Sequence, residues 1–326
     1  MKRLKLAWPD WFRAGSRSVF GVSVAIGEHQ ARWVYGEVSV GDCLRFKTIQ
    51  GHGGIPVSSV AEPQGQLISR DLLANLFQQV LFALPGQLPK PELLVICLPS
   101  RQAYFGELVV SESEDEQSIE FQIQDMMEAA AGNTEREAAY DWQLKSRLSD
   151  GSLTLAVAGI DQLQVDEVLA ACEQVKLKCA GITLDSVASI NGYVQMIRDD
   201  AALSSLRFLL HGELSRHRIR LAVFSQGVLF HESTEQSEEG FSLVQSVAAL
   251  ERLVATWARE GAMEEPGSVR LILGGEIMYA KGCDATVRRS QILSSRLLDV
   301  TPRKELAGQW HDSVVPYGAL EAMPCA

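Results

Sequence analysis

One order of predicted elements occurs twice in this chain, and it restricts the fold more than any single motif does. In each copy three short strands form a meander, followed by a loop, an amphipathic helix and an apolar strand. The first copy has strands at residues 19–26, 31–40 and 43–49, a loop at 50–66, a helix at 69–84 and a strand at 93–98. The second has strands at 206–212, 218–224 and 228–232, a loop at 233–240, a helix at 241–260 and a strand at 269–273. Such an internal duplication predicts an α/β protein made of two related halves.

The first copy is interrupted by a segment of a different kind. Residues 103–110 predict a strand, 114–131 an acidic helix, 139–144 and 153–160 two strands, and 164–176 a helix. A strand at 179–184 and a helix at 186–198 then return the chain to the first half. We therefore predict a leader at 1–18, a first domain at 19–99 plus 179–203, an inserted α+β subdomain at 100–178 and a second domain at 204–326.

Charge and motif content argue against several classes of function. A net charge of −11 over 326 residues is unfavourable for a surface that binds nucleic-acid phosphates. The six cysteines form no CxxC pair, which favours reduced thiols and a cytoplasmic location. The six histidines lack metal-binding spacings, and no GxSxG, Walker or Rossmann motif occurs. The sequence therefore gives no support to a metalloenzyme, an ordinary hydrolase or a dehydrogenase.

The predicted leader combines basic and aromatic side chains. Trp8, Trp11 and Phe12 lie among five lysines and arginines, and Pro9 interrupts any helix. Two interpretations are open. The leader is either a disordered basic segment or a weak peripheral contact with the anionic face of a membrane.

Two segments resemble a known family. Residues 94–101, with the strand and acidic helix that follow them, are similar to PilM, the cytoplasmic actin-like component of type IV pilus assembly. So are residues 155–185, which read Leu-Ala-Val-Ala-Gly-Ile at 155–160 and Ala-Gly-Ile-Thr-Leu-Asp at 180–185. HofM, MshI and the cytoplasmic part of GspL are relatives of that family. The resemblance implies an actin-like (RNase H-like) two-lobed α/β fold, with the small α+β subdomain inserted in the first lobe, at the inner-membrane face.

The resemblance also shows where nucleotide motifs have been lost. Active members hold phosphate with glycine hairpins and Mg²⁺ through an aspartate on the first strand of each half. Here Ser23 and Ala25 stand on the first strand, and no aspartate precedes Gly212 on the second. A degenerate cofactor site, if any, is placed at Gly21, Ser23, Gly27, Gly212, Gly274 and Gly275. A Gly-Gly pair is also a common strand-to-helix turn. We expect a pseudo-ATPase without cofactor, and an ATPase that binds ATP with Mg through divergent motifs is the alternative.

The function implied by the resemblance is that of a scaffold. A PilM-like protein binds the N-terminal tail of an inner-membrane PilN-like partner between the first domain and the inserted unit, where strand addition would suit the groove. The candidates for its wall are Phe105, Leu108, Val110, Leu184 and Asp185, although core packing would explain each equally well. The acidic run at 112–128 favours a solvated helix face, with docking of a basic partner as the alternative. A filament protein of the cell-division type is a third possibility.

Overall fold

The computed structural model describes the chain in fourteen segments. They are residues 2–3, 17–27, 30–41, 44–57, 69–100, 103–130, 137–199, 203, 206–225, 228–259, 269–275, 277, 282–297 and 310–321. The chain divides into two compact units, residues 1–186 with 323–326, and residues 187–322. Within the segments above, no helix is long and apolar enough to span a bilayer.

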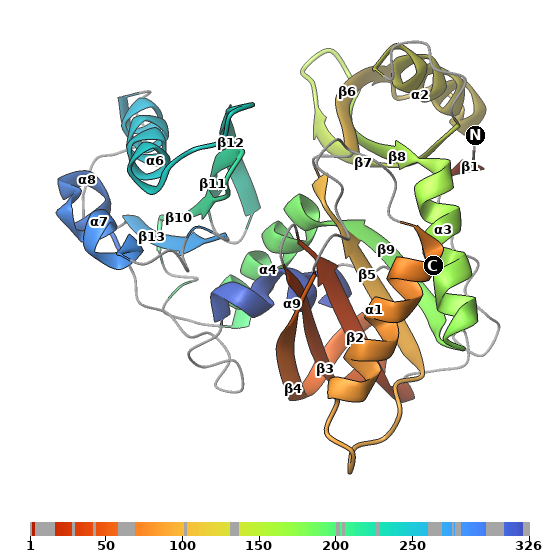
Figure 1. The fold of residues 1–326 in the computed structure, drawn as a ribbon. Coiled ribbons are helices and arrows are strands. Elements are labelled where there is room, and N and C mark those ends of the chain that lie inside the picture. The colour runs from red at the N-terminus through yellow and green to blue at the C-terminus, as the bar shows by residue number, and fades with distance from the viewer. Residues whose placement is uncertain are drawn as a thin grey trace. The chain divides into compact units, whose positions relative to one another are not determined.

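A mixed five-stranded sheet forms the centre of the first unit (Figure 1). Its strands, in spatial order, are β4 (Leu44–Pro56), β3 (Gln30–Val40), β2 (Arg17–Ile26), β5 (Leu93–Leu98) and β9 (Lys178–Leu184). The first three are antiparallel, whereas β5 runs parallel to β2 and β9 runs parallel to β5. Helices α1 (Arg70–Ala83) and α3 (Gln162–Gln174) contact each other and share one apolar core with the sheet.

A second sheet belongs to the inserted segment. Its spatial order is β1 (Lys2–Arg3), β7 (Ala138–Arg147), β8 (Ser152–Asp161) and β6 (Ala103–Ser111). Helix α2 (Glu116–Ala130) covers one face through Ile119, Ile123 and Met127 (Figure 1). Lys2 and Arg3, which belong to the predicted leader, thus pair with β7. Trp8, Trp11 and Phe12 lie outside the described residues.

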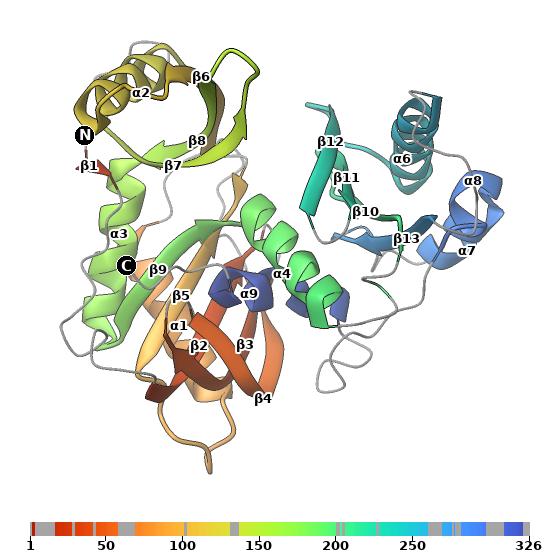
Figure 2. The same cartoon turned by 180° about the vertical axis from the view of Figure 1, so that it is seen from behind.

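The second unit repeats the strand arrangement of the first. Its sheet has the order β12 (Val228–Gln236), β11 (Arg218–Ser225), β10 (Phe208–Leu214) and β13 (Val269–Gly274), with β13 parallel to β10 and the others antiparallel. Helix α6 (Leu243–Trp257) contacts the short helices α7 (Cys283–Arg289) and α8 (Gln291–Ser294) (Figure 2). The last helix of this unit is α9 (Trp310–Glu321). A capping box at Ser242 and Gln245 starts α6. The predicted duplication is confirmed.

Two strands are longer than the sequence predicts. β4 continues through residues 50–56, which we assigned to a loop, and pairs with β3 as far as Pro56 opposite Gln30. The glycines of this stretch leave room for Trp33, because a Cβ on Gly53 would lie 2.9 Å from its ring. β12 likewise extends past residue 232 to Gln236. In both strands, cross-strand pairing outweighs a composition that is typical of loops.

Helix α4 (Asp185–Asp199) contains the point at which the two compact units divide, between residues 186 and 187. Our sequence-based limit for the first domain was residue 203. The later turns of α4 pack within the second unit, where Gly318 of α9 lies against the backbone of Ala188 and Gly192. A side chain on Gly318 would lie 1.9 Å from the Ala188 carbonyl oxygen, so this close approach requires glycine.

Candidate functional site

Ser23 occupies the centre of β2, where the resemblance would place a metal-binding carboxylate. The residue is completely buried, and its neighbours in the sheet register are Val34 of β3 and Val95 of β5. Its Oγ has no hydrogen-bond partner among the described residues. With a valine on each side and no charge of its own, this position supplies no ligand suited to a hard cation such as Mg²⁺.

The mid-strand glycines of the two related strands are explained by packing. A Cβ on Gly21 of β2 would lie 2.6 Å from Cδ1 of Leu93. A Cβ on Gly212 of β10 would lie 2.6 Å from Cδ2 of Leu250. Both leucines are fully buried, so the space beside each glycine is filled by the core rather than open to a ligand.

The turn after each of these strands is closed in the same way. The Gly27 N–H donates to the carbonyl oxygen of Gln30 at 3.1 Å, and the Ser215 N–H donates to that of Arg218 at 3.0 Å. A phosphate-binding hairpin directs its backbone amides toward the ligand. Here the first amide of each turn is satisfied within its own hairpin.

The Gly274–Gly275 turn is fitted closely to its surroundings in the second unit. A Cβ on Gly274 would lie 2.9 Å from Nε2 of His211 and 3.0 Å from the Tyr193 hydroxyl. These two rings are buried with their centroids 3.9 Å apart, and burial raises the pKa of Tyr193. Gly275 has φ of 96°, and a Cβ there would lie 2.5 Å from the Leu214 carbonyl oxygen. The fold itself therefore requires glycine at both positions.

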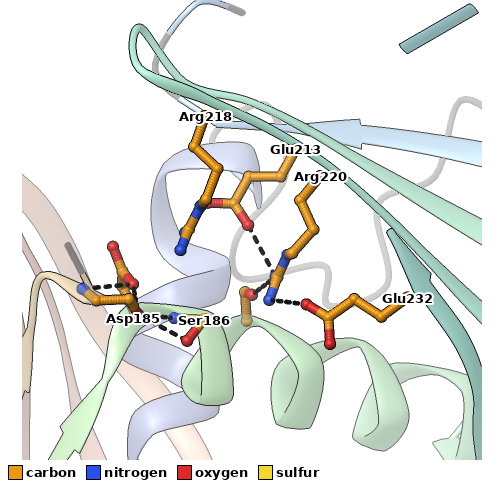
Figure 3. A network of polar contacts seen from close by, with 8 residues as sticks. Asp185, Ser186, Glu213, Arg218, Arg220 and Glu232 are labelled. Carbon is orange, nitrogen blue, oxygen red and sulfur yellow. Dashed lines mark hydrogen bonds and ion pairs between the residues drawn. The ribbon is translucent and has the colours of Figure 1, made fainter. Parts of the chain in front are cut away.

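A group of charged side chains surrounds the buried Arg220 and Glu213 (Figure 3), and Glu213 pairs with Gly274 in the sheet register. Arg220, 1% exposed, has Nη2 at 2.8 Å from Oε2 of Glu213 and Nη1 at 3.5 Å from Oε1 of Glu232. Its Nη2 also donates to the Ser189 hydroxyl of α4. Arg218 Nη2 donates to Oε1 of Glu213 at 3.2 Å. We call these five residues the charged network.

The charged network keeps Glu213 ionised. Burial alone would raise the pKa of Glu213, but the Arg220 and Arg218 guanidiniums outweigh it and lower that pKa from 4.5 to about 2. Two arginines and two glutamates thus balance one another within the second unit. The negative charge at the end of β10 is matched by the protein's own cations.

A second polar cluster lies at the carboxyl ends of β5 and β9, which are parallel neighbours in the first sheet. Ser100 follows β5, and Asp185 and Ser186 follow β9 (Figure 3). The Ser100 N–H donates to Oδ1 of Asp185 at 3.0 Å, its hydroxyl contacts the same oxygen, and the Ser186 N–H donates back to the Ser100 hydroxyl at 3.0 Å. Asp185 and Ser186 therefore tie the residue that follows β5 to the start of α4.

The remaining wall candidates differ in their exposure. Phe105 of β6 is 54% exposed, whereas Val110 is 3% exposed and belongs to the core under α2. Leu108 also packs against that core, and Leu184 packs partly against the core of the first sheet. The structure adds Val109, which is 57% exposed and which the sequence analysis did not single out. Odd-numbered residues of β6 face away from α2.

Sequence reasoning missed the charged network, although a signal for it was present. Arg218 and Arg220 stand two residues apart in an otherwise apolar strand, so their side chains share one face. Glu213 pairs directly with Arg220 in the antiparallel register. Counting the hairpin register outward from the turn at residues 215–218 would have predicted that Glu213 lies opposite Arg220.

Comparison with known proteins shows first the class of fold. The chain is similar to a protein from Bacteroides thetaiotaomicron with an actin-like ATPase fold and unknown function, at 11% identity over 90% of this chain and 95% of the other, with a TM-score of 0.50. The duplicated sheets and the inserted subdomain therefore form an actin-like α/β fold.

The similarity that the sequence indicated is confirmed at the level of the fold. The chain matches a structure of the PilM–PilN type IV pilus biogenesis complex with a TM-score of 0.65, at 15% identity, over 92% of this chain and 96% of the other. No family model and no curated protein matches the sequence.

Proposed function

We propose that this protein is a cytoplasmic scaffold of type IV pilus assembly, or of a related secretion system, that binds the N-terminal tail of an inner-membrane PilN-like protein. The observation that carries the proposal is the similarity, over nearly the whole chain, to a structure of a PilM–PilN complex. At 15% identity it is a likeness of fold, so the residues of this chain must supply the rest of the argument.

The proposal includes the absence of ATP hydrolysis. Three features support it: the uncharged, enclosed position of Ser23, the first amide of each hairpin bonded within its own turn, and the rings of Tyr193 and His211 beside Gly274. A hydrolytic site needs a carboxylate for Mg²⁺ and free amides for phosphate. The glycines at the corresponding positions here are packed closely against the protein's own side chains and backbone.

For the partner tail we propose the exposed side of β6. Phe105 offers an apolar side chain to the tail, and Leu108 and Val110 contribute backbone groups of the same strand. Leu184 and Asp185, at the end of β9, are the further candidates, and the contacts of Asp185 and Ser186 with Ser100 tie them to the residue that precedes the inserted segment. An added strand gains affinity from main-chain hydrogen bonds and selectivity from alternate side chains.

Calorimetric titration with synthetic N-terminal tails of membrane proteins encoded nearby tests this function. We expect one tail to bind, and Phe105→Glu to weaken it by about tenfold or more, because a buried interface aromatic typically contributes about 2 kcal/mol. Phe121→Glu is the matched control, since Phe121 is 64% exposed on α2. If no tail binds at millimolar concentration, the proposed function is wrong.

We also propose that Trp8, Trp11 and Phe12 give the protein a weak hold on the anionic inner face of the membrane. The basic residues around them support this proposal. Sedimentation with anionic vesicles should fall as salt is added. Equal sedimentation of a chain that begins at Ser18 would refute the anchor.

A further inference from the structure

Two of the cysteines lie close together where helix α3 ends and strand β9 begins. The Lys176 N–H donates to the Glu173 carbonyl oxygen at 3.0 Å. The Leu177 N–H donates to the Cys172 carbonyl oxygen, also at 3.0 Å. These two bonds, with Lys176 at φ of 58°, form the Schellman motif that ends many helices. The motif turns the chain at residues 175–177, so β9 starts beside the last turn of α3 and contacts that helix.

The sheet register turns Cys179 toward the same helix. Cys179 of β9 pairs with Leu94 of β5, and Leu94 belongs to the apolar core that α1 and α3 share with the sheet. Side chains that are paired in register lie on the same face of a sheet. Cys172 is 2% exposed in that core, and Cys179 packs against it. The two thiols therefore meet between α3 and β9. The Cys172 thiol donates a hydrogen bond to the Cys179 sulfur, and the Cys179 thiol lies 3.7 Å from the Gly181 carbonyl oxygen.

The two thiols differ in acidity and in their access to solvent. The hydrogen bond from Cys172 lowers the pKa of Cys179, and the same bond together with burial raises the pKa of Cys172. Cys179 is partly exposed, on an edge strand that pairs with β5 and with no other strand of the described residues. Because the thiolate is the reactive form of cysteine, Cys179 is the thiol that meets a reagent first.

We infer that Cys172 and Cys179 are a site of reversible oxidation, at which a hydroperoxide converts the two thiols to a disulfide. The Cys179 thiolate attacks one peroxide oxygen, the O–O bond breaks and hydroxide leaves, so that Cys179 becomes a sulfenic acid. The Cys172 sulfur then attacks the Cys179 sulfur, the S–O bond breaks, and the Cys172 proton leaves with the hydroxide as water. Each sulfur loses one electron, and two thiols and one peroxide give one disulfide and two waters. The new bond ties α3 to β9 and does not depend on the proposed function.

Peptide mapping of the full chain after treatment with hydrogen peroxide tests this site. Free thiols are blocked with N-ethylmaleimide, and trypsin then cuts at the two lysines that lie between the cysteines of the pair. We expect the peptides that carry Cys172 and Cys179 to become linked about tenfold faster than Cys97 or Cys283 is oxidised, because the latter two have no thiolate at the protein surface. Dithiothreitol should restore both thiols.

Two serine variants test the order of the steps. In Cys172→Ser, oxidation of Cys179 should stop at the sulfenic acid, which dimedone labels. In Cys179→Ser, Cys172 should stay reduced at the same dose of peroxide. Cys283→Ser, in the second unit, is the matched control and should leave the linkage unchanged. Mapping of the native chain decides the matter if a variant does not fold. No link between Cys172 and Cys179, a link from either one to another cysteine, or equal labelling of the two variants would each overturn the inference.

Discussion

Neutralising Glu213 should destabilise the second unit specifically. In the variant Glu213→Gln the shape of the side chain is kept, but Arg220 and Arg218 lose the carboxylate that lies 2.8 Å and 3.2 Å from them. Arg220 is 1% exposed, so water cannot replace the lost partner. It keeps its contacts with the more distant Glu232, at 3.5 Å, and with the Ser189 hydroxyl.

The expected cost is about 3 kcal/mol. Folding lowers the pKa of Glu213 from 4.5 to about 2, and each pKa unit corresponds to about 1.4 kcal/mol of preference for the charged form. Because the folded pKa is the lower one, this stabilisation is complete above pH 4.5 and is lost as the pH falls toward 2. The native second unit should therefore weaken in that window, and the variant should show little of this dependence.

Thiol exposure in urea can report on the two units separately. Cys283 is 2% exposed in the second unit, and Cys97 is fully buried in the first. A dithiodipyridine reagent, which stays reactive at acid pH, with the labelled cysteine located by mass spectrometry, gives an unfolding free energy for each. We expect Glu213→Gln to expose Cys283 at lower urea and to leave Cys97 unchanged.

Glu235→Gln is the matched control for this experiment. Glu235 pairs with Arg252 at 2.5 Å, but that arginine side chain is 60% exposed, so loss of the pair should cost no more than about 1 kcal/mol. The reasoning fails if the two variants are equally stable, or if Cys97 and Cys283 respond alike to Glu213→Gln.

Three further predictions concern small residues. Gly275→Ala should lower the free energy of unfolding by about 2–4 kcal/mol, because it sets a Cβ against the Leu214 backbone at φ of 96°. Gly86→Ala is the control: Gly86 has open space around it, so this change should be close to neutral in the same urea titration. Ser23→Ala should change stability by less than about 1 kcal/mol, because the buried hydroxyl has no partner among the described residues; a larger loss would mean that it does. Ser100→Ala should lower the free energy of unfolding by about 1–3 kcal/mol, because the Asp185 carboxylate and the Ser186 amide lose their contacts with the hydroxyl. Exposure of Cys97 in urea measures this loss, and a neutral result would refute the structural role of this cluster.

The fold could be predicted from the sequence because its elements carry contrasting patterns. The strands are short, largely apolar runs that end at turn residues, whereas the helix at residues 69–84 has its apolar residues spaced three and four apart. What could not be predicted were the far ends of β4 and β12. Gly51, Gly53 and Gly54 are typical of a loop. They lie in a strand because side chains of β3 occupy the space beside them, Trp33 at the first two and Gln30 at the third.

The candidate site was less accessible to sequence reasoning. Leu108, Val109 and Val110 are all apolar, so a two-residue period does not decide which of them faces α2. The structure places Val110 in the core and Val109 in solvent. The pairing of Glu213 with Arg220 depends on a hairpin register that strand propensity alone does not fix. By contrast, the replacement of a carboxylate by Ser23 could be read directly once the resemblance was recognised.

The charged network bears on our proposal that this chain works without nucleotide. A bound nucleotide stabilises the proteins that hold it, through contacts made only in the folded state. In this chain Glu213, Arg218 and Arg220 form ion pairs at the end of β10. We propose that this charge pairing within the second unit takes the place of the contacts that a nucleotide would make.

The central claim is that this actin-like fold recognises a protein segment and not a nucleotide. Calorimetric titration of the full chain with Mg-ATP, to millimolar concentration and alongside a thermal-shift measurement, tests it most directly. We predict neither binding heat nor a shift in melting temperature. Saturable binding at micromolar ATP, accompanied by stabilisation, would contradict the account.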